Sequence, residues 1–206
     1  MIALAAIFLL LGSFGGAENQ IDVKIVQALT DWRQSSRNLT IGVILLTWVG
    51  SIYVTLGLVG LVGLGLWWKG RTRPAILLAA TVFGERLTAD GLKLLYDRAR
   101  PVFDLHPVVT SSSSFPSGHA ANAMTAFVAI ALIAVPPQRR GSALVAAIPL
   151  AVAIGLSRPY LGVHWPTDVL GGWALAAIVL LAMNALRTDE AEHQIVGGHR
   201  APTVKG

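Results

Sequence analysis

The chain has 206 residues, enough for one domain, and 54% of them are hydrophobic against 13% charged. A mean hydropathy of +0.63 argues against a soluble protein and favours an integral membrane protein. The lack of cysteine excludes disulfides and a thiolate metal site. The net charge of +5 fits anchoring at anionic head groups better than nucleic-acid binding, because the basic residues flank apolar runs.

Apolar runs in the first third of the chain predict two membrane spans with an interfacial helix between them. Residues 1–16 are uncharged but shorter than the roughly 20 residues of a straight span, so we expect a tilted or truncated helix. A signal-peptide core is the alternative, although the leading basic segment is missing. Residues 17–38 are polar and periodic, which predicts an amphipathic helix at the interface. Residues 39–68 predict a second span with a bent or tilted start.

Four further runs complete the expected set. The third span begins at Pro74 and continues to Pro101, the fourth covers 118–136, and the fifth covers 142–156 with a kink at Pro149. The sixth runs from Pro166 to Leu186, and residues 187–206 predict a flexible tail. The expectation is therefore an all-α polytopic membrane protein, a single domain over residues 1–206 with six transmembrane helices.

The loop charges predict an orientation. Basic residues between spans two and three, between four and five, and after six fall on the side of both termini, which the positive-inside rule makes cytoplasmic. The asymmetry is imperfect, because the opposite loops also carry basic residues. Three stretches of unusual polar residues all fall on that opposite side, which predicts an active site at the outer membrane interface.

The first stretch, KLLYDRARP, holds Lys93 and Arg100 seven residues apart, or two helical turns. On one helix face, these cations would bind two oxygens of one phosphate. The plainer interpretation is a pair of Lys93 with Asp97 and basic side chains that reach the interface. Upstream lie Glu85 and the i, i+4 pair Arg86 and Asp90, for which we expect buried structural pairing, with a lining role at the site as the alternative.

The second stretch is Pro116-Ser117-Gly118-His119, directly before an apolar run. Ser117 suits the N-cap of the fourth span, and Gly118 permits close approach of a ligand. The unpaired first amides of a helix form an anion site, at whose rim His119 would lie. A capped helix with an interfacial histidine is the plainer interpretation.

The third stretch, SRPYLGVHWPTD, contains Arg158, His164 and Asp168. Arg158 follows about fifteen apolar residues, roughly 22 Å of helix, so it should lie below the outer surface in a recess. An aspartate on Nδ1–H of His164 would fix the tautomer and leave Nε2 as a base or nucleophile. A histidine near an N-terminal aspartate on a helix dipole is the alternative.

Together, Lys-x6-Arg-Pro, Pro-Ser-Gly-His and Ser-Arg-x5-His-x3-Asp resemble the three-part signature of the type 2 phosphatidic acid phosphatase family. Every signature position is filled, and the short first span and the tail are the departures. The resemblance implies that His164 forms a phosphohistidine, that Asp168 orients it, and that His119 protonates the leaving oxygen. The phosphate ligands that it implies are Lys93, Arg100, Arg158, Ser117 and the amide of Gly118.

The resemblance also implies a function. We expect an integral membrane lipid phosphatase of a bacterial inner membrane, with its site facing the periplasm or exterior and its lipid phosphate substrate drawn from the bilayer. Isoprenyl pyrophosphate and phosphatidylglycerol phosphate are favoured. We expect no metal, no cofactor and no nucleic-acid partner. The alternatives are a lipid A phosphatase, a phosphotransferase, a soluble-type vanadium haloperoxidase, which six spans argue against, and a non-catalytic lipid binder, which would not need His164 and Asp168.

Overall fold

The computed structural model describes residues 1–103, 107–108 and 112–197, with side chains described as far as Arg187. The described residues are helical and contain no strand, so the predicted all-α class is confirmed. The elements are α1 (Ile2–Phe14), α2 (Gln20–Ser35), α3 (Arg37–Val49), α4 (Ile52–Trp68), α5 (Thr72–Tyr96), α6 (Gly118–Ile133), the 3₁₀ turn η1 (Pro137–Arg139), α7 (Arg140–Tyr160) and α8 (Pro166–Gly197).

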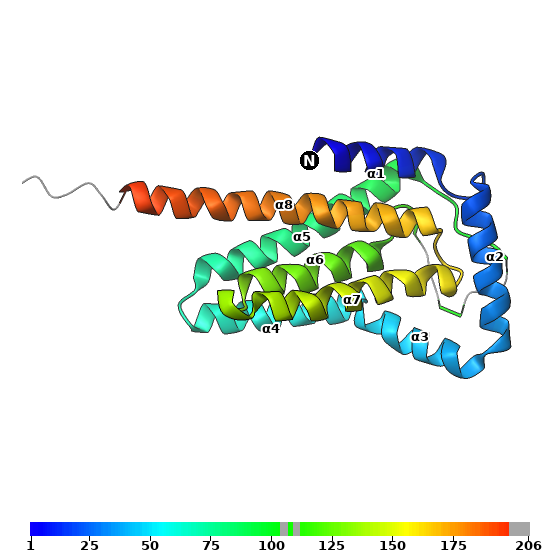
Figure 1. Ribbon diagram of the computed structural model, residues 1–206, viewed down its shortest axis with the longest axis horizontal. Helices are drawn as coiled ribbons and strands as arrows, with labels where there is room; N and C mark the ends of the chain where they lie inside the picture. Colours follow the sequence, from blue (N-terminus) through cyan, green and yellow to red (C-terminus); the bar gives the residue numbers. More distant parts are fainter. Residues whose placement is uncertain (104–106, 109–111, 198–206) are drawn as a thin grey trace, which may run out of the picture.

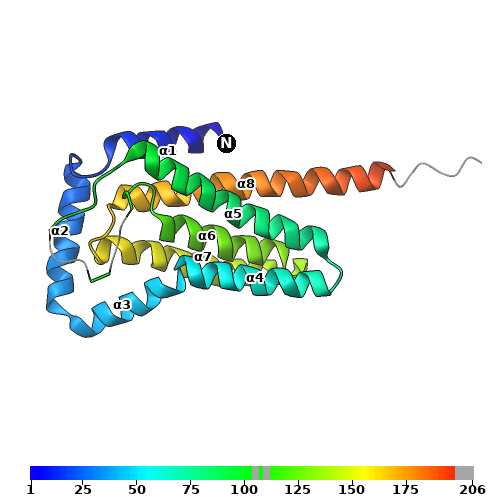
Figure 2. The same ribbon diagram turned by 180° about the vertical axis from the view of Figure 1, so that it is seen from behind.

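The long helices lie side by side, and α2 crosses one end of the bundle (Figures 1 and 2). Helix α6 lies inside, packed against α4, α5, α7 and α8, while α1 packs along α8. Its interior position follows from its composition, because alanines on every face let neighbouring backbones approach closely. The buried alanines of α6 are Ala120, Ala121, Ala123, Ala126, Ala129 and Ala131.

The outer surface of the bundle is rich in large apolar side chains, as expected where lipid replaces water. Two helical segments are long and apolar enough to cross a membrane, Pro137–Tyr160 and Pro166–Arg187. Helices α3 and α4 form a third candidate as one span bent by 42°. Helices α1 and α6 are apolar but shorter, so the predicted number of six spans stays a prediction.

Of two predictions about where helices bend or end, one is confirmed and one is wrong. The bent start of the 39–68 run is present as the break between α3 and α4, where Gly50 and Ser51 interrupt the helix. The prediction that Lys93 and Arg100 share one helix face is wrong. Helix α5 ends at Tyr96, and Asp97 takes a left-handed conformation with φ of 40°, so the chain leaves the helix before Arg100.

The last two helices are longer than the apolar runs. Helix α7 continues through both Pro149 and Pro159 to Tyr160, which makes Arg158 a helical residue. Helix α8 continues to Gly197, past the expected start of the tail at Arg187, and residues 198–206 lie outside the described part.

The two ends of the bundle carry different loops, and this predicts a labelling pattern. The basic turns between α4 and α5 and between α6 and α7 lie at the end opposite α2 (Figure 1). If they are cytoplasmic, a membrane-impermeant maleimide on intact cells should label Ser35→Cys, at the exposed end of α2, and should spare Gly141→Cys. Permeabilised cells should label both. Label on Gly141→Cys alone in intact cells would invert the orientation.

Candidate active site

A small polar cavity of about 180 Å³ lies at the end of the bundle that α2 crosses. It brings together residues from the loop after α5, the start of α6, the end of α7 and the loop before α8. Four cations and two histidines line it, and its described lining contains no carboxylate. The lining residues are Gly50, Ile52, Arg86, Lys93, Arg100, Gly118, His119, Asn122, Arg158 and His164.

Arg158 is held in the recess that its position in the sequence predicted. It lies in the last turn of α7 and is only 3% exposed. Its Nη1 donates to Thr47 Oγ1 of α3 at 2.8 Å, while its Nε has no hydrogen-bond partner among the described residues. A buried cation with a neutral partner keeps its full charge, so Arg158 remains able to bind an anion in the cavity.

Lys93 and Arg100 both line the cavity, but Lys93 belongs to helix α5 and Arg100 to the loop after it. Lys93 lies in the last turn of α5, and its Nζ donates to Ser112 Oγ at 3.1 Å. Arg100 comes from the loop, where its Nε donates to Ser112 O at 2.8 Å and its Nη1 to Val163 O at 2.5 Å. The two cations therefore converge as predicted, although loop contacts rather than helical spacing bring them together.

His164 lies in the loop between α7 and α8 and is 2% exposed. Its Nε2 is 3.1 Å from Arg100 Nη1. A guanidinium group can only donate, so Nε2 must accept and the ring proton of a neutral His164 is on Nδ1. Nδ1 lies 3.3 Å from Asp168 Oδ2 and 3.4 Å from Ser114 Oγ. The predicted pairing of His164 with Asp168 is present.

Asp168 lies behind His164 in the first turn of α8, fully buried. Its Oδ2 accepts hydrogen bonds from Ser114 Oγ and, at 2.8 Å, from the backbone N–H of Trp165. Its Oδ1 accepts from Arg98 Nη1 at 2.8 Å. Neither Ser114 nor Arg98 was predicted from the sequence to contact Asp168. The only signal was their position, beside the Pro-Ser-Gly-His and Arg-Pro motifs.

The start of α6 forms the third side of the cavity. Ser117 is the N-cap residue as predicted, but its side chain makes no capping bond, and its buried Oγ has no partner among the described residues. Ser117 is also absent from the cavity lining, whereas Gly118 and His119 belong to it. A Cβ on Gly118 would lie 3.4 Å from Arg86 Nη1 and 3.7 Å from Lys93 Nζ, so glycine leaves room between helix start and cations.

The two acidic residues of α5, Glu85 and Asp90, differ in their contacts. Arg86 Nε pairs with Asp90 Oδ2 at 2.8 Å as predicted, but this pair is partly exposed rather than buried, and Arg86 also lines the cavity. Glu85 is fully buried, and neither oxygen has a partner in the described part of the chain. No group of three or more His, Asp or Glu residues that could hold a metal ion occurs among the described residues.

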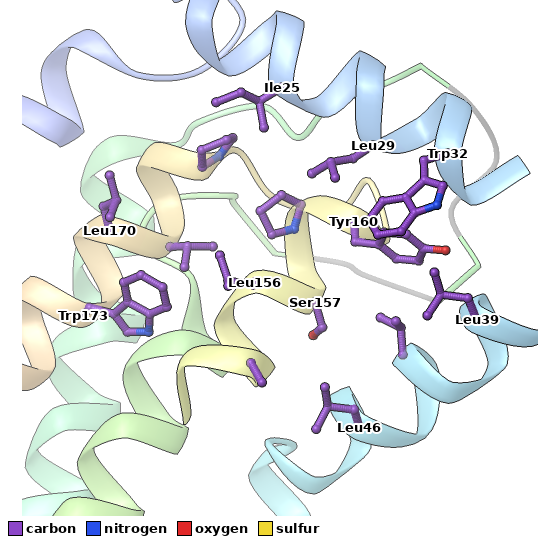
Figure 3. Close-up of a pocket in the computed structure, with 15 residues that line it drawn as sticks. Ile25, Leu29, Trp32, Leu39, Leu46, Leu156, Ser157, Tyr160, Leu170 and Trp173 are labelled. Atoms are coloured by element: carbon purple, nitrogen blue, oxygen red, sulfur yellow. The ribbon is translucent and has the colours of Figure 1, made fainter. Parts of the chain in front are cut away.

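An apolar cavity of about 580 Å³ lies beside the polar one, between α2, α3, α7 and α8. Figure 3 shows side chains from these helices pointing into it. Consecutive residues of α7 separate the two cavities, because Ser157 lines the apolar one and Arg158 the polar one. The apolar lining includes Ile25, Leu29, Trp32, Leu39, Leu46, Leu156, Tyr160, Leu170 and Trp173.

The surroundings of His164 favour its neutral form. Burial lowers the pKa of His164 well below the ordinary value of 6.5, and the charges of Arg100, Arg158 and Lys93 lower it further. A neutral ring with its proton on Nδ1 presents the Nε2 lone pair to the cavity. This is the form needed for attack on an electrophile.

Comparison with known proteins gives a consistent picture. The family model of the PAP2 superfamily matches residues 45–191. Phosphatidylglycerophosphatase B of Bacillus subtilis is 35% identical over 140 residues, which cover 65% of this chain and 68% of that protein. An undecaprenyl-diphosphatase of Sulfolobus acidocaldarius is 37% identical over 82 residues, 40% of this chain and 37% of the relative.

A solved structure resembles the whole bundle. It is the crystal structure of a transmembrane PAP2 type phosphatidylglycerolphosphate phosphatase from Bacillus subtilis. The TM-score is 0.84 at 30% identity, and the alignment covers 91% of this chain and 96% of that one.

The lowered pKa of His164 gives a pH prediction. The pKa of His164 in the folded chain lies below its unfolded value, so the ring should stay neutral as the pH falls through 6.5. Below that pH the unfolded chain binds a proton that the folded chain does not, so the free energy of unfolding should decrease. Histidine-selective ¹⁵N NMR, assigned with His164→Ala, should show this. Arg100→Gln should raise the pKa of His164, whereas Arg71→Gln, at the far end of the bundle, should leave it unchanged. Protonation of His164 at an ordinary histidine pKa would contradict the prediction.

Proposed function

This chain belongs to the PAP2 superfamily and is an integral membrane lipid phosphatase, and we propose that it cleaves a lipid phosphate or pyrophosphate through a phosphohistidine at His164. The observation that carries the proposal is one arrangement. The unprotonated Nε2 of His164 faces a cavity lined by cations, and a buried carboxylate lies on the other side of the ring.

Binding of the phosphate would free the nucleophile. In the described structure Arg100 donates to Nε2 of His164, so the lone pair is occupied. A phosphate oxygen is a stronger acceptor for a guanidinium than a neutral imidazole, because both partners are then charged. Arg100 would turn to the phosphate together with Lys93 and Arg158, and the amides at the start of α6 would bind a further oxygen. The lone pair of Nε2 is then available.

The two chemical steps divide between the histidines. In the first, Nε2 of His164 forms a bond to phosphorus, the bond to the leaving oxygen breaks, and His119 gives that oxygen its proton. In the second, water attacks phosphorus, its proton passes to His119, and the N–P bond breaks to regenerate His164 with release of phosphate. Asp168 would stabilise the positive charge on the phosphorylated ring through the Nδ1–H.

The cations would perform the electrostatic role that magnesium has in many phosphoryl-transfer sites. Arg86, Lys93, Arg100 and Arg158 already line the cavity. We therefore propose that the reaction needs no divalent metal and no cofactor. The resemblance implied Ser117 as a phosphate ligand, but we propose that it supports the site instead, because Gly118 and His119 line the cavity and Ser117 does not.

The neighbouring apolar cavity supports a lipid substrate. A phosphate bound in the polar cavity would lie a few residues along α7 from a space suited to a hydrocarbon chain (Figure 3). We favour phosphatidylglycerol phosphate or an isoprenyl pyrophosphate, in line with the names of the two relatives. A lipid A phosphatase or a phosphotransferase would use the same site. We place the site at the periplasmic or outer face of a bacterial inner membrane.

Metal independence has a direct test. Purified protein in detergent should release phosphate from lipid phosphates in excess EDTA as fast as without it, because fixed cations provide the charge stabilisation. Vanadate should inhibit as a phosphate mimic. A magnesium-dependent phosphatase treated in parallel should lose its activity. Loss of activity in EDTA with recovery in magnesium would contradict the proposed arrangement.

The roles of the histidines can be separated by the leaving group. His119→Ala should lower kcat/KM for a lipid phosphate by about 10²- to 10⁴-fold and should recover part of that loss with an aryl phosphate, whose leaving oxygen needs no proton. His164→Ala should recover nothing. Acid-labile, base-stable label from radioactive substrate should appear on the wild type in a rapid quench and be absent from His164→Ala. If both variants recovered equally with the aryl phosphate, the assignment of His164 as nucleophile and His119 as acid would be wrong.

A further inference from the structure

Arg98 lies outside the polar cavity and contacts the buried carboxylate of Asp168 behind His164. The side chain is 9% exposed, and its Nη1 donates to Asp168 Oδ1 at 2.8 Å and to Thr167 Oγ1 at 3.2 Å. Its guanidinium group also lies over the ring of Phe115, 4.4 Å from the centroid. Among the described contacts, Arg98 is the donor recorded for Oδ1, while Ser114 and the Trp165 amide serve Oδ2.

The other arm of the guanidinium is anchored on α1. Nη2 of Arg98 donates to the carbonyl oxygens of Leu11 and Gly12, both at 2.6 Å. These carbonyls belong to the last turn of α1, where they have no partner within the helix and where the helix dipole favours a cation. One planar group therefore connects the end of α1 to the carboxylate behind His164.

The turn after α1 is fixed to the same place. Asp22 of α2 is buried and accepts from the backbone N–H of Gly16 at 2.7 Å and of Thr167 at 3.1 Å. A Cβ on Gly15 would lie 2.1 Å from Thr167 Oγ1 and 2.7 Å from Arg98 Nη1, which leaves no space for a side chain between the turn, the start of α8 and the guanidinium group. The end of α1, Arg98 and the first turn of α8 thus form one contact network.

From this network we infer that Arg98 is a positioning residue for the reaction and that the C-terminal carbonyls of α1 are its anchor. The inference rests on the proposed function of the site. Arg98 holds Asp168 in the orientation that receives Nδ1–H of His164, and α1 holds Arg98. Helix α1 thus belongs to the catalytic apparatus, although the family match begins only at residue 45.

A positioning role and a purely structural role of Arg98 predict different kinetics for its variants. Arg98 does not line the cavity, so its loss should lower kcat and leave KM nearly unchanged. If it acts through Asp168, its loss should matter little once that carboxylate is gone. A residue that merely stabilises the fold would lower activity equally in both backgrounds.

The experiment is a double-mutant cycle with Arg98→Gln and Asp168→Asn, assayed on a lipid phosphate. Arg98→Gln should lower kcat by about 10- to 100-fold, the loss of one charged hydrogen bond, but by less than about threefold in the Asp168→Asn background. The matched control is Arg71→Gln, since Arg71 also donates to a helix-terminal carbonyl, Ile133 O, but at the far end of the bundle. It should leave kcat within about twofold of wild type. Independent losses that multiply would overturn the inference.

A second pair of variants tests the anchor on α1. Gly15→Ala should displace Thr167 and Arg98 together and lower kcat with little change in KM, because its Cβ would lie 2.1 Å from Thr167 Oγ1 and 2.7 Å from Arg98 Nη1. Gly42→Ala adds the same atom where no other atom lies within 4 Å and should leave kcat unchanged. If both variants retain full kcat, α1 is not an anchor for the site.

An NMR measurement separates this inference from the function itself. The Nδ1–H resonance of His164 reports its hydrogen bond to Asp168 and needs no turnover. It should move in Arg98→Gln and stay in place in Arg71→Gln, whether or not the protein hydrolyses the lipids tested. An unmoved resonance overturns the inference alone, whereas absence of hydrolysis by the wild type overturns only the proposed function. Should Arg98→Gln not fold, Arg98→Lys, which keeps the charge but not the fork, carries the same comparison.

Discussion

The concentration of positive charge in one small cavity is the constraint to which the rest of the site is fitted. Arg86, Lys93, Arg100 and Arg158 line the same space, and like charges in a medium of low dielectric constant repel strongly. The partners recorded for Lys93, Arg100 and Arg158 inside the protein are hydroxyl groups, carbonyl oxygens and an imidazole, which orient the cations without neutralising them. The cavity therefore keeps an uncompensated positive charge, which a bound phosphate group would neutralise.

The carboxylates of Asp168 and Asp90 lie where they do not neutralise the positive charge inside the cavity. Asp168 lies behind His164, where Arg98 pairs with it, and Asp90 pairs with Arg86 on the partly exposed side. A carboxylate inside the cavity would compete with the phosphate for the same donors. Placed behind the imidazole, Asp168 would act on a substrate only through the ring, so its pairing with Arg98 would not weaken the binding of an anion in the cavity.

The sequence was informative where function depends on residue type and spacing, and less so where it depends on tertiary contacts. The spacing of His164 and Asp168 predicted their pairing, and the short apolar run before Arg158 predicted its recess; the structure has both. The same logic failed for Arg100, because the left-handed Asp97 ends α5 early. Ser114 and Arg98 were missed because their partners lie 54 and 70 residues away, which no local pattern encodes. The number of spans is equally hard to predict from hydropathy, since α5 carries charges and α1 and α6 are short.

The short helix α6 and the position of Arg158 account for the depth of the site. Sixteen residues of α6 extend about 24 Å, less than the roughly 30 Å hydrocarbon core, so the two ends of this helix cannot both reach the surfaces of a membrane. Near the start of α6, the end of α7 contributes residues to both cavities, because Leu156 and Ser157 line the apolar cavity and Arg158 lines the polar one. The phosphate group of a bound lipid would therefore enter the polar cavity, and its hydrocarbon chain would enter the apolar one. Under the proposed function the polar cavity would bind only the group that all lipid phosphates share, so discrimination between lipids would come from the apolar surfaces beside it. A phosphate site of this kind would not by itself select one lipid, which agrees with the different lipids in the names of the relatives.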